Sequence, residues 1–109
     1  MANPKYVLNL KTLRAGDVDK VGGKNASLGE MISQLAASGI RVPGGFATTA
    51  EGYREFLAHG GLRQRIDARL GTLNIEDVDA LAKCGAEIRG WIEQTPFPPA
   101  FQEAITLAY

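Results

Sequence analysis

Side chains that usually form catalytic or metal sites are scarce in this sequence. It holds one cysteine, Cys84, and one histidine, His59, among 109 residues. A single cysteine excludes an internal disulfide framework and a multi-cysteine metal site. Cys84 falls within an apolar helical pattern, so we expect it to be buried. A free thiol is typical of a protein of the reducing cytoplasm.

The sequence also lacks an excess of charge and a long apolar run. Twelve Lys and Arg residues balance twelve Asp and Glu residues. We therefore expect no electrostatic attraction to nucleic acid or to an anionic membrane. The first ten residues lack the apolar segment of a signal peptide, and no stretch is long enough to span a membrane. We expect a cytoplasmic protein whose affinity for any phosphate comes from a local site.

What is present is the composition of one small globular domain, with 45% hydrophobic and 22% charged residues. Apolar runs at residues 6–10 and 46–48 predict two short strands, and residues 11–19 read as a connection with at most one helical turn. The sequence then predicts a helix that ends at Gly39. Its apolar face, at helical spacing, consists of Leu28, Met31, Ile32, Leu35 and Ala36.

Four further helices follow in the pattern. Thr48 and Glu51 match a capping box for the first of them, and a short one ends at Gly71. Asn74 is a candidate cap for a longer helix that prolines break from residue 96. A last helix starts near Pro99 and runs to the end of the sequence. Such a helix-rich α/β chain with few short strands makes a poor closed fold, because an isolated strand pair is marginally stable. We therefore expect residues 1–109 to be a fragment of a larger domain.

The strongest local candidate for chemistry is the turn Gly22-Gly23-Lys24, which opens directly into a helix. Glycines let backbone N–H groups approach an anion, the start of a helix favours phosphate, and lysine adds a point charge. It is not a Walker P-loop, which needs glycine where this chain has Val18 and Ser or Thr where it has Asn25. The residues alone leave two interpretations open, a phosphate contact or a plain turn with a surface lysine.

Other chemistry-bearing residues predict no second site. His59 lies near the glycine end of a predicted helix, where a solvated or capping role is expected. Trp91 sits at helical spacing and is expected in the core. No carboxylate cluster with a partner histidine suggests a metal site. Three arginines spread around one predicted helix and are expected on a solvated face: Arg63, Arg65 and Arg69.

Longer stretches resemble a known family. Residues 17–31 (DVDKVGGKNASLGEM) closely resemble the opening of phosphoenolpyruvate synthases, the pyruvate, water dikinases, and residues 42–50 (VPGGFATTA) resemble their second block. The resemblance continues through residues 81–83, 91–92 and 95–97. Relatives in the wider dikinase family include pyruvate phosphate dikinase and rifampicin phosphotransferase.

The resemblance implies an N-terminal fragment of an ATP-grasp-type nucleotide-binding domain. In such enzymes this domain binds ATP with Mg²⁺, a central domain carries a phosphorylated histidine, and a C-terminal barrel phosphorylates pyruvate. The products are AMP, phosphoenolpyruvate and phosphate, as in gluconeogenesis. The matching family position makes Lys24 a ligand of the ATP phosphates, with Gly22 and Gly23 shaping the loop around it.

The same comparison implies that much is missing from residues 1–109. The phosphohistidine domain and the barrel are absent, and His59 lacks the surroundings of the family's phosphorylated histidine. We therefore expect no catalytic residue and no metal site here, no activity of the isolated chain, and ATP binding near or weaker than about 1 mM. Two alternatives stay open: a related enzyme with phosphate or an antibiotic as acceptor, and a non-catalytic, stand-alone helical interaction module.

Overall fold

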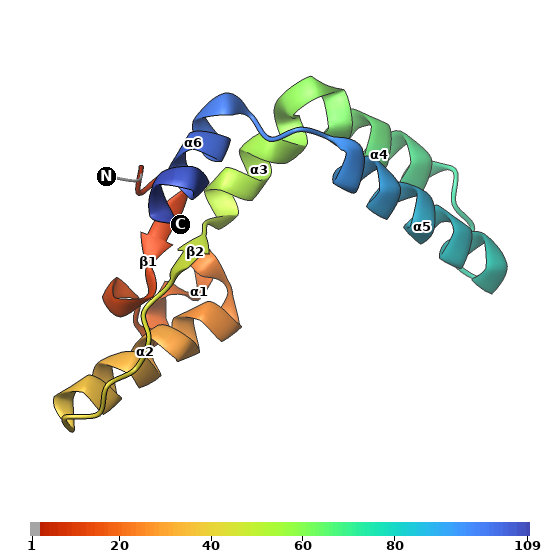
Figure 1. Ribbon diagram of the computed structural model, residues 1–109. Coiled ribbons are helices and arrows are strands. Elements are labelled where there is room, and N and C mark those ends of the chain that lie inside the picture. The colour runs from red at the N-terminus through yellow and green to blue at the C-terminus, as the bar shows by residue number, and fades with distance from the viewer. Residues whose placement is uncertain (1–2) are drawn as a thin grey trace. The chain divides into compact units, whose positions relative to one another are not determined.

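The computed structural model describes residues 3–109, which divide into two compact units (Figure 1). The first unit combines the chain up to Arg54 with Pro99–Tyr109, and the second is Glu55–Pro98. Helices dominate both units, and within residues 3–109 the strands form one two-stranded sheet in the first unit. The expected helix-rich α/β chain with few short strands is confirmed.

The sheet joins two segments that lie far apart in the sequence. Strand β1, Val7–Asn9, runs antiparallel to strand β2, Phe46–Thr48, with Leu8 opposite Ala47. The Leu10 N–H donates to the Gly45 carbonyl at 2.9 Å and extends the pairing by one step. The strand expected at residues 6–10 is confirmed for its middle three residues, and the one at 46–48 in full.

Three short helical segments connect β1 to the first long helix, where a connection with at most one turn was predicted. They are the 3-10 turns η1, Leu10–Thr12, and η2, Ala15–Asp17, and the short helix α1, Val18–Val21. Helix α2 follows at Gly23–Ala37. It ends as predicted, because Gly39 adopts a positive φ of 80° just beyond it.

The face that α2 buries matches the predicted one at Ile32 but differs from it at other positions. The buried positions are Ala26, Gly29 and Ile32, whereas Leu28 and Met31 are 37% and 47% exposed. The prediction followed the larger apolar side chains. The small residues face inward instead, because α2 lies directly against the backbone of the η1 turn.

The core of the first unit lies between α2, the 3-10 turns and the sheet. Its buried cluster consists of Leu10, Leu13, Val21, Ala26, Ile32 and Ala47. Helix α6, Pro99–Ala108, packs on the other end of β1, where the Phe101 ring stacks on Tyr6 with 5.6 Å between centroids. The predicted apolar face of α6 is confirmed at Phe101 and Ala104, both buried.

Helix α3, Ala50–Ala58, is capped one residue later than predicted. The cap is Thr49, whose Oγ1 accepts from the Gly52 N–H at 3.0 Å. The same hydroxyl donates to the Lys5 carbonyl. Glu51 forms an ion pair with Lys5 at 3.9 Å and takes no part in a capping box. The capping box at Thr48 was therefore wrong, because a bond to a distant carbonyl selects the neighbouring threonine.

The second unit contains the 3-10 turn η3, His59–Gly61, and the helices α4, Leu62–Gly71, and α5, Val78–Gln94. The cap of α5 is Asp77, whose side chain accepts from the Ala80 N–H at 3.1 Å. The predicted cap, Asn74, accepts from the Glu76 N–H in the preceding turn. That prediction was three residues too early, because both residues make the same kind of local bond.

Helices α4 and α5 lie side by side (Figure 1), and two arginines of α4 contact side chains of α5. The Arg65 guanidinium lies over the Trp91 ring, 4.1 Å from its centroid, and Arg69 Nε donates to Glu87 Oε2 at 2.8 Å. Arg63 and Arg65 are exposed, as expected, whereas Arg69 is half-buried, so the expected solvated face was wrong for Arg69. Cys84 is 1% exposed, so its predicted burial is confirmed.

Candidate functional site

The turn between α1 and α2 depends on the backbone of Gly22. Its φ of 83° and ψ of 165° lie in a region that is essentially restricted to glycine. The Gly22 N–H closes α1 on the Val18 carbonyl at 2.8 Å, and the Gly22 carbonyl accepts from the Ala26 N–H at 3.1 Å in α2. One residue therefore ends one helix and begins the next.

The first backbone N–H groups of α2 are left without a capping side chain. Gly22 occupies the N-cap position, where serine, threonine or aspartate usually accept from these amides, and the first turn holds no acidic residue. The Asn25 side chain does not cap these amides, because it donates to the Val21 carbonyl at 3.0 Å. The positive end of the helix dipole is therefore open to an external anion.

Lys24 stands at this helix start as an exposed cation. Within residues 3–109, no carboxylate lies within ion-pair distance of its ammonium group. The adjacent Lys20 pairs with Asp17 at 3.5 Å. A hydrogen bond from the Arg14 backbone N–H, reinforced by Lys20, holds the pKa of the Asp17 carboxyl below its usual range. The Asp17 carboxylate is thus already occupied by Lys20 and by the Arg14 backbone.

A shallow depression of about 400 Å³ adjoins the turn. Gly23, Lys24, Ser27, Leu28 and Met31 line it. Sequence reasoning placed Gly22, Gly23 and Lys24 at one turn, and the structure brings them together. It missed Leu28 and Met31, which had been assigned to the core. Their spacing of four and seven residues from Lys24 puts all three on one helix face, and that signal was available.

The remaining candidates belong to the second unit. His59 is exposed in η3, in the second unit, and Cys84 is buried in α5. Residues 3–109 gather no group of three or more His, Cys, Asp or Glu side chains that could hold a metal ion. Over the same residues, no helix combines the length and apolar character needed to cross a membrane.

Comparison with known proteins gives a consistent family. Residues 18–109 match the family described as the pyruvate phosphate dikinase, AMP/ATP-binding domain. The chain is 61% identical over 104 residues to a phosphoenolpyruvate synthase of Neisseria meningitidis. It is 54% identical over 105 residues to the one of Pseudomonas aeruginosa and 53% identical over 103 residues to the one of Escherichia coli.

These alignments cover 94–96% of this chain. The chain spans only 13% of the length of each of these curated relatives. Both the family match and the alignments include the turn at Gly22–Lys24. The resemblance to phosphoenolpyruvate synthases is therefore confirmed over nearly the whole chain, and the chain belongs to the family of pyruvate phosphate dikinase AMP/ATP-binding domains.

Proposed function

We propose that the turn at Gly22, Gly23 and Lys24 contacts the phosphate groups of ATP. The observation that carries this proposal is the start of α2, which has no capping side chain and has beside it a lysine with no ion-pair partner among residues 3–109. A phosphate oxygen there accepts hydrogen bonds from the backbone amides and gains the helix dipole. Lys24 supplies the neutralising charge.

The chain is, in this proposal, part of an ATP-grasp-type nucleotide-binding domain in a cytoplasmic phosphoenolpyruvate synthase. The whole enzyme uses ATP, pyruvate and water and releases AMP, phosphoenolpyruvate and phosphate by way of a phosphohistidine. Identity above 50% to three synthases supports this assignment. The chain spans 13% of their length, so the phosphohistidine and barrel domains, and the catalytic residues, belong to the other parts of such an enzyme.

The contribution of this segment is positioning and charge. Phosphoryl transfer depends on holding the phosphates in line and on stabilising their charge. The positive φ of Gly22 favours glycine, and because glycine has no side chain a phosphate can approach the backbone amides closely. Mg²⁺ would screen the phosphates when bound with ATP. Residues 3–109 gather no group of three or more His, Cys, Asp or Glu side chains that could hold this ion.

The isolated chain is expected to bind ATP weakly. One charge-assisted hydrogen bond contributes about 1.5–3 kcal/mol, while association costs about 4–15 kcal/mol. The depression beside Lys24 is shallow, and its apolar walls, Leu28 and Met31, cover little of a nucleotide. A dissociation constant near or above about 1 mM follows.

The test is a titration of the nitrogen-15-labelled chain with Mg-ATP, followed by its amide spectrum. The proposal predicts shifts at Gly22, Gly23 and Lys24 that are lost in a Lys24→Ala variant. Lys83→Ala removes an exposed lysine of α5 and is the matched control, which should keep the shifts. Shifts confined to other residues, or a Lys24→Ala variant that responds like the parent chain, would rule out this phosphate contact.

A further inference from the structure

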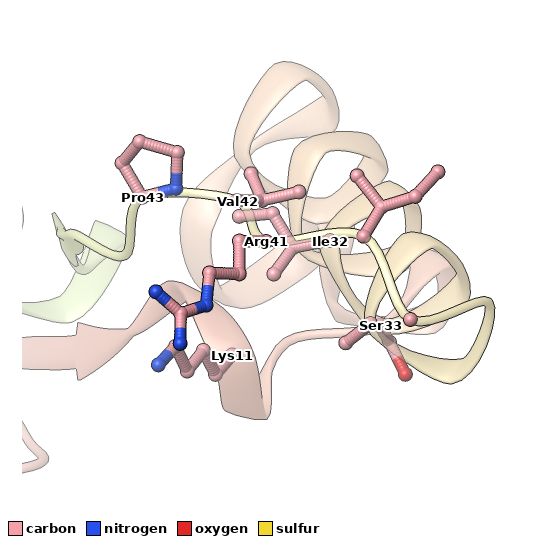
Figure 2. Close-up of a pocket in the computed structure, with 9 residues that line it drawn as sticks. Lys11, Ile32, Ser33, Arg41, Val42 and Pro43 are labelled. Carbon is pink, nitrogen blue, oxygen red and sulfur yellow. The ribbon is translucent and has the colours of Figure 1, made fainter.

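We propose that a groove of the first unit, distinct from the depression beside Lys24, binds an extended peptide segment. This peptide carries a carboxylate side chain next to apolar ones. The groove has a volume of about 750 Å³ and lies between the C-terminal half of α2 and residues 39–43 (Figure 2). It is separate from the turn at Lys24, because Lys24 and Ile32, the nearest α2 residue of the groove, are about 12 Å apart along the helix at 1.5 Å per residue. The inference does not rest on the proposed phosphate contact.

The walls of the groove are mainly apolar. Ile32 forms the floor and is 3% exposed. Val42 packs on the core cluster beside it, while Ile40 at the rim keeps 51% of its surface exposed. An apolar side chain that entered the groove would remove this surface from water, which is favourable in proportion to the area covered.

Two cations stand on the same side of the groove. Figure 2 shows the charged ends of Lys11 and Arg41 next to each other at the edge of the groove. The Lys11 stem lies against the backbone of Gly44, where an added Cβ would come within 3.3 Å of its Cε. Neither cation has a carboxylate within ion-pair distance among residues 3–109. A carboxylate placed between them would relieve their repulsion and form charge-assisted hydrogen bonds.

The backbone beside the groove can also pair with a peptide. Residues 40–45 have no regular secondary structure. Within the described chain, the backbone N–H groups of Arg41, Val42 and Gly44 donate to no other backbone group, and Pro43 has none to donate. An extended peptide can bind such a segment by main-chain hydrogen bonds, while alternate side chains fill the groove.

A carboxylate suits this groove better than a phosphate does. The far end of the groove is the C-terminal end of α2, where Ser38, Gly39 and Ile40 donate to the last carbonyl groups of the helix. The helix dipole is negative there and disfavours a doubly charged group. A singly charged side chain held near Lys11 and Arg41 avoids that end.

The experiment uses the nitrogen-15-labelled 109-residue chain and a peptide that alternates valine with glutamate, blocked at both ends. Its matched control peptide has glutamine in place of glutamate. We expect amide shifts at Ile32, Arg41, Val42 and Gly44. Because exposed ion pairs are weak, Lys11→Gln or Arg41→Gln should each raise the dissociation constant about 1.5- to 5-fold. Lys83→Gln, on α5, should leave it unchanged.

The contrary outcomes are equally specific. The proposal is wrong if millimolar acidic peptide shifts none of these amides, or if the glutamine peptide binds as tightly. It is also wrong if both glutamine variants bind like the parent chain. Inorganic phosphate that produced the same shifts would assign the groove to a small anion. Concentration-dependent shifts of the chain alone, with self-association in sedimentation, would assign it to a second copy.

Discussion

Gly29 in α2 lies so close to Leu13 that a Cβ added to the glycine would come within 2.5 Å of the leucine Cβ. The carbonyl oxygens of Leu10 and Leu13 would each lie 2.8 Å away from it. Real Cβ atoms essentially never come this close to backbone atoms, so a larger residue would have to displace the η1 turn. The glycine is what allows α2 to contact that turn directly.

We therefore predict that Gly29→Ala destabilises the chain, by about 1–3 kcal/mol of unfolding free energy measured in urea. Alanine is the better helix former by about 1 kcal/mol, so the loss arises from packing. Gly90→Ala is the matched control. Gly90 is also inside a helix, α5, but has nothing within 4 Å of its added Cβ. It should gain up to about 1 kcal/mol. Equal responses of the two variants would contradict the close approach.

This contact also explains where sequence reasoning failed on α2. The period of the pattern correctly predicted a helix and its end at Gly39. It could not select the buried face, because the large residues Leu28 and Met31 and the small residues Ala26 and Gly29 both recur at helical spacing. The choice depends on how near another backbone approaches, and that is a tertiary property.

The helix caps and the candidate site also combine features that the local sequence predicts with features that depend on tertiary contacts. Thr48 and Thr49 are equally good caps by residue type, and only the bond from Thr49 to the distant Lys5 carbonyl separates them. The phosphate contact at Gly22–Lys24 stays a prediction, and its signal is a short run of residues. The apolar lining beside Lys24 was missed, since it follows from the face that α2 leaves exposed.

Two neighbouring glycines should respond differently to alanine at the candidate site. Gly22 has a positive φ of 83° and Gly23 does not, and neither has an atom within 4 Å of an added Cβ. Gly22→Ala should cost about 1–3 kcal/mol through backbone strain alone. Gly23→Ala should stay within about 0.5 kcal/mol of the parent chain. Urea unfolding of both variants measures this, and a Gly22→Ala chain as stable as the Gly23→Ala chain would mean that the turn adopts another conformation.

The cap of α3 gives a third test. Thr49→Ala removes the acceptor of the Gly52 N–H and the donor to the Lys5 carbonyl. Loss of an N-cap costs about 1–2 kcal/mol, and Thr49→Ser should restore most of it because serine keeps the hydroxyl. Thr48→Ala, at the exposed neighbouring position, should change stability by less than about 0.5 kcal/mol. Thermal unfolding followed by circular dichroism distinguishes the two positions, and the opposite ranking would reinstate the capping box at Thr48.

The ion pair between α4 and α5 predicts a dependence of stability on pH. The hydrogen bond from Arg69 holds the pKa of the Glu87 carboxyl below its usual range. Because the pKa is lower in the folded chain than in the unfolded one, the stabilisation is complete above the unfolded value of about 4.3. It is lost as the pH falls through the lower folded value. Glu87→Gln should therefore lower the melting temperature at pH 7, and the difference from the parent chain should close as the pH falls toward 3.

The control for this prediction is Glu93→Gln, an exposed position on the same helix. It has no ion-pair partner within residues 3–109 and should leave the melting temperature at pH 7 unchanged. High salt should narrow the gap between Glu87→Gln and the parent chain, because the pair is partly exposed to solvent. A gap that persisted unchanged down to pH 3 would show that Glu87 stabilises the two helices by packing of its side chain rather than by its charge.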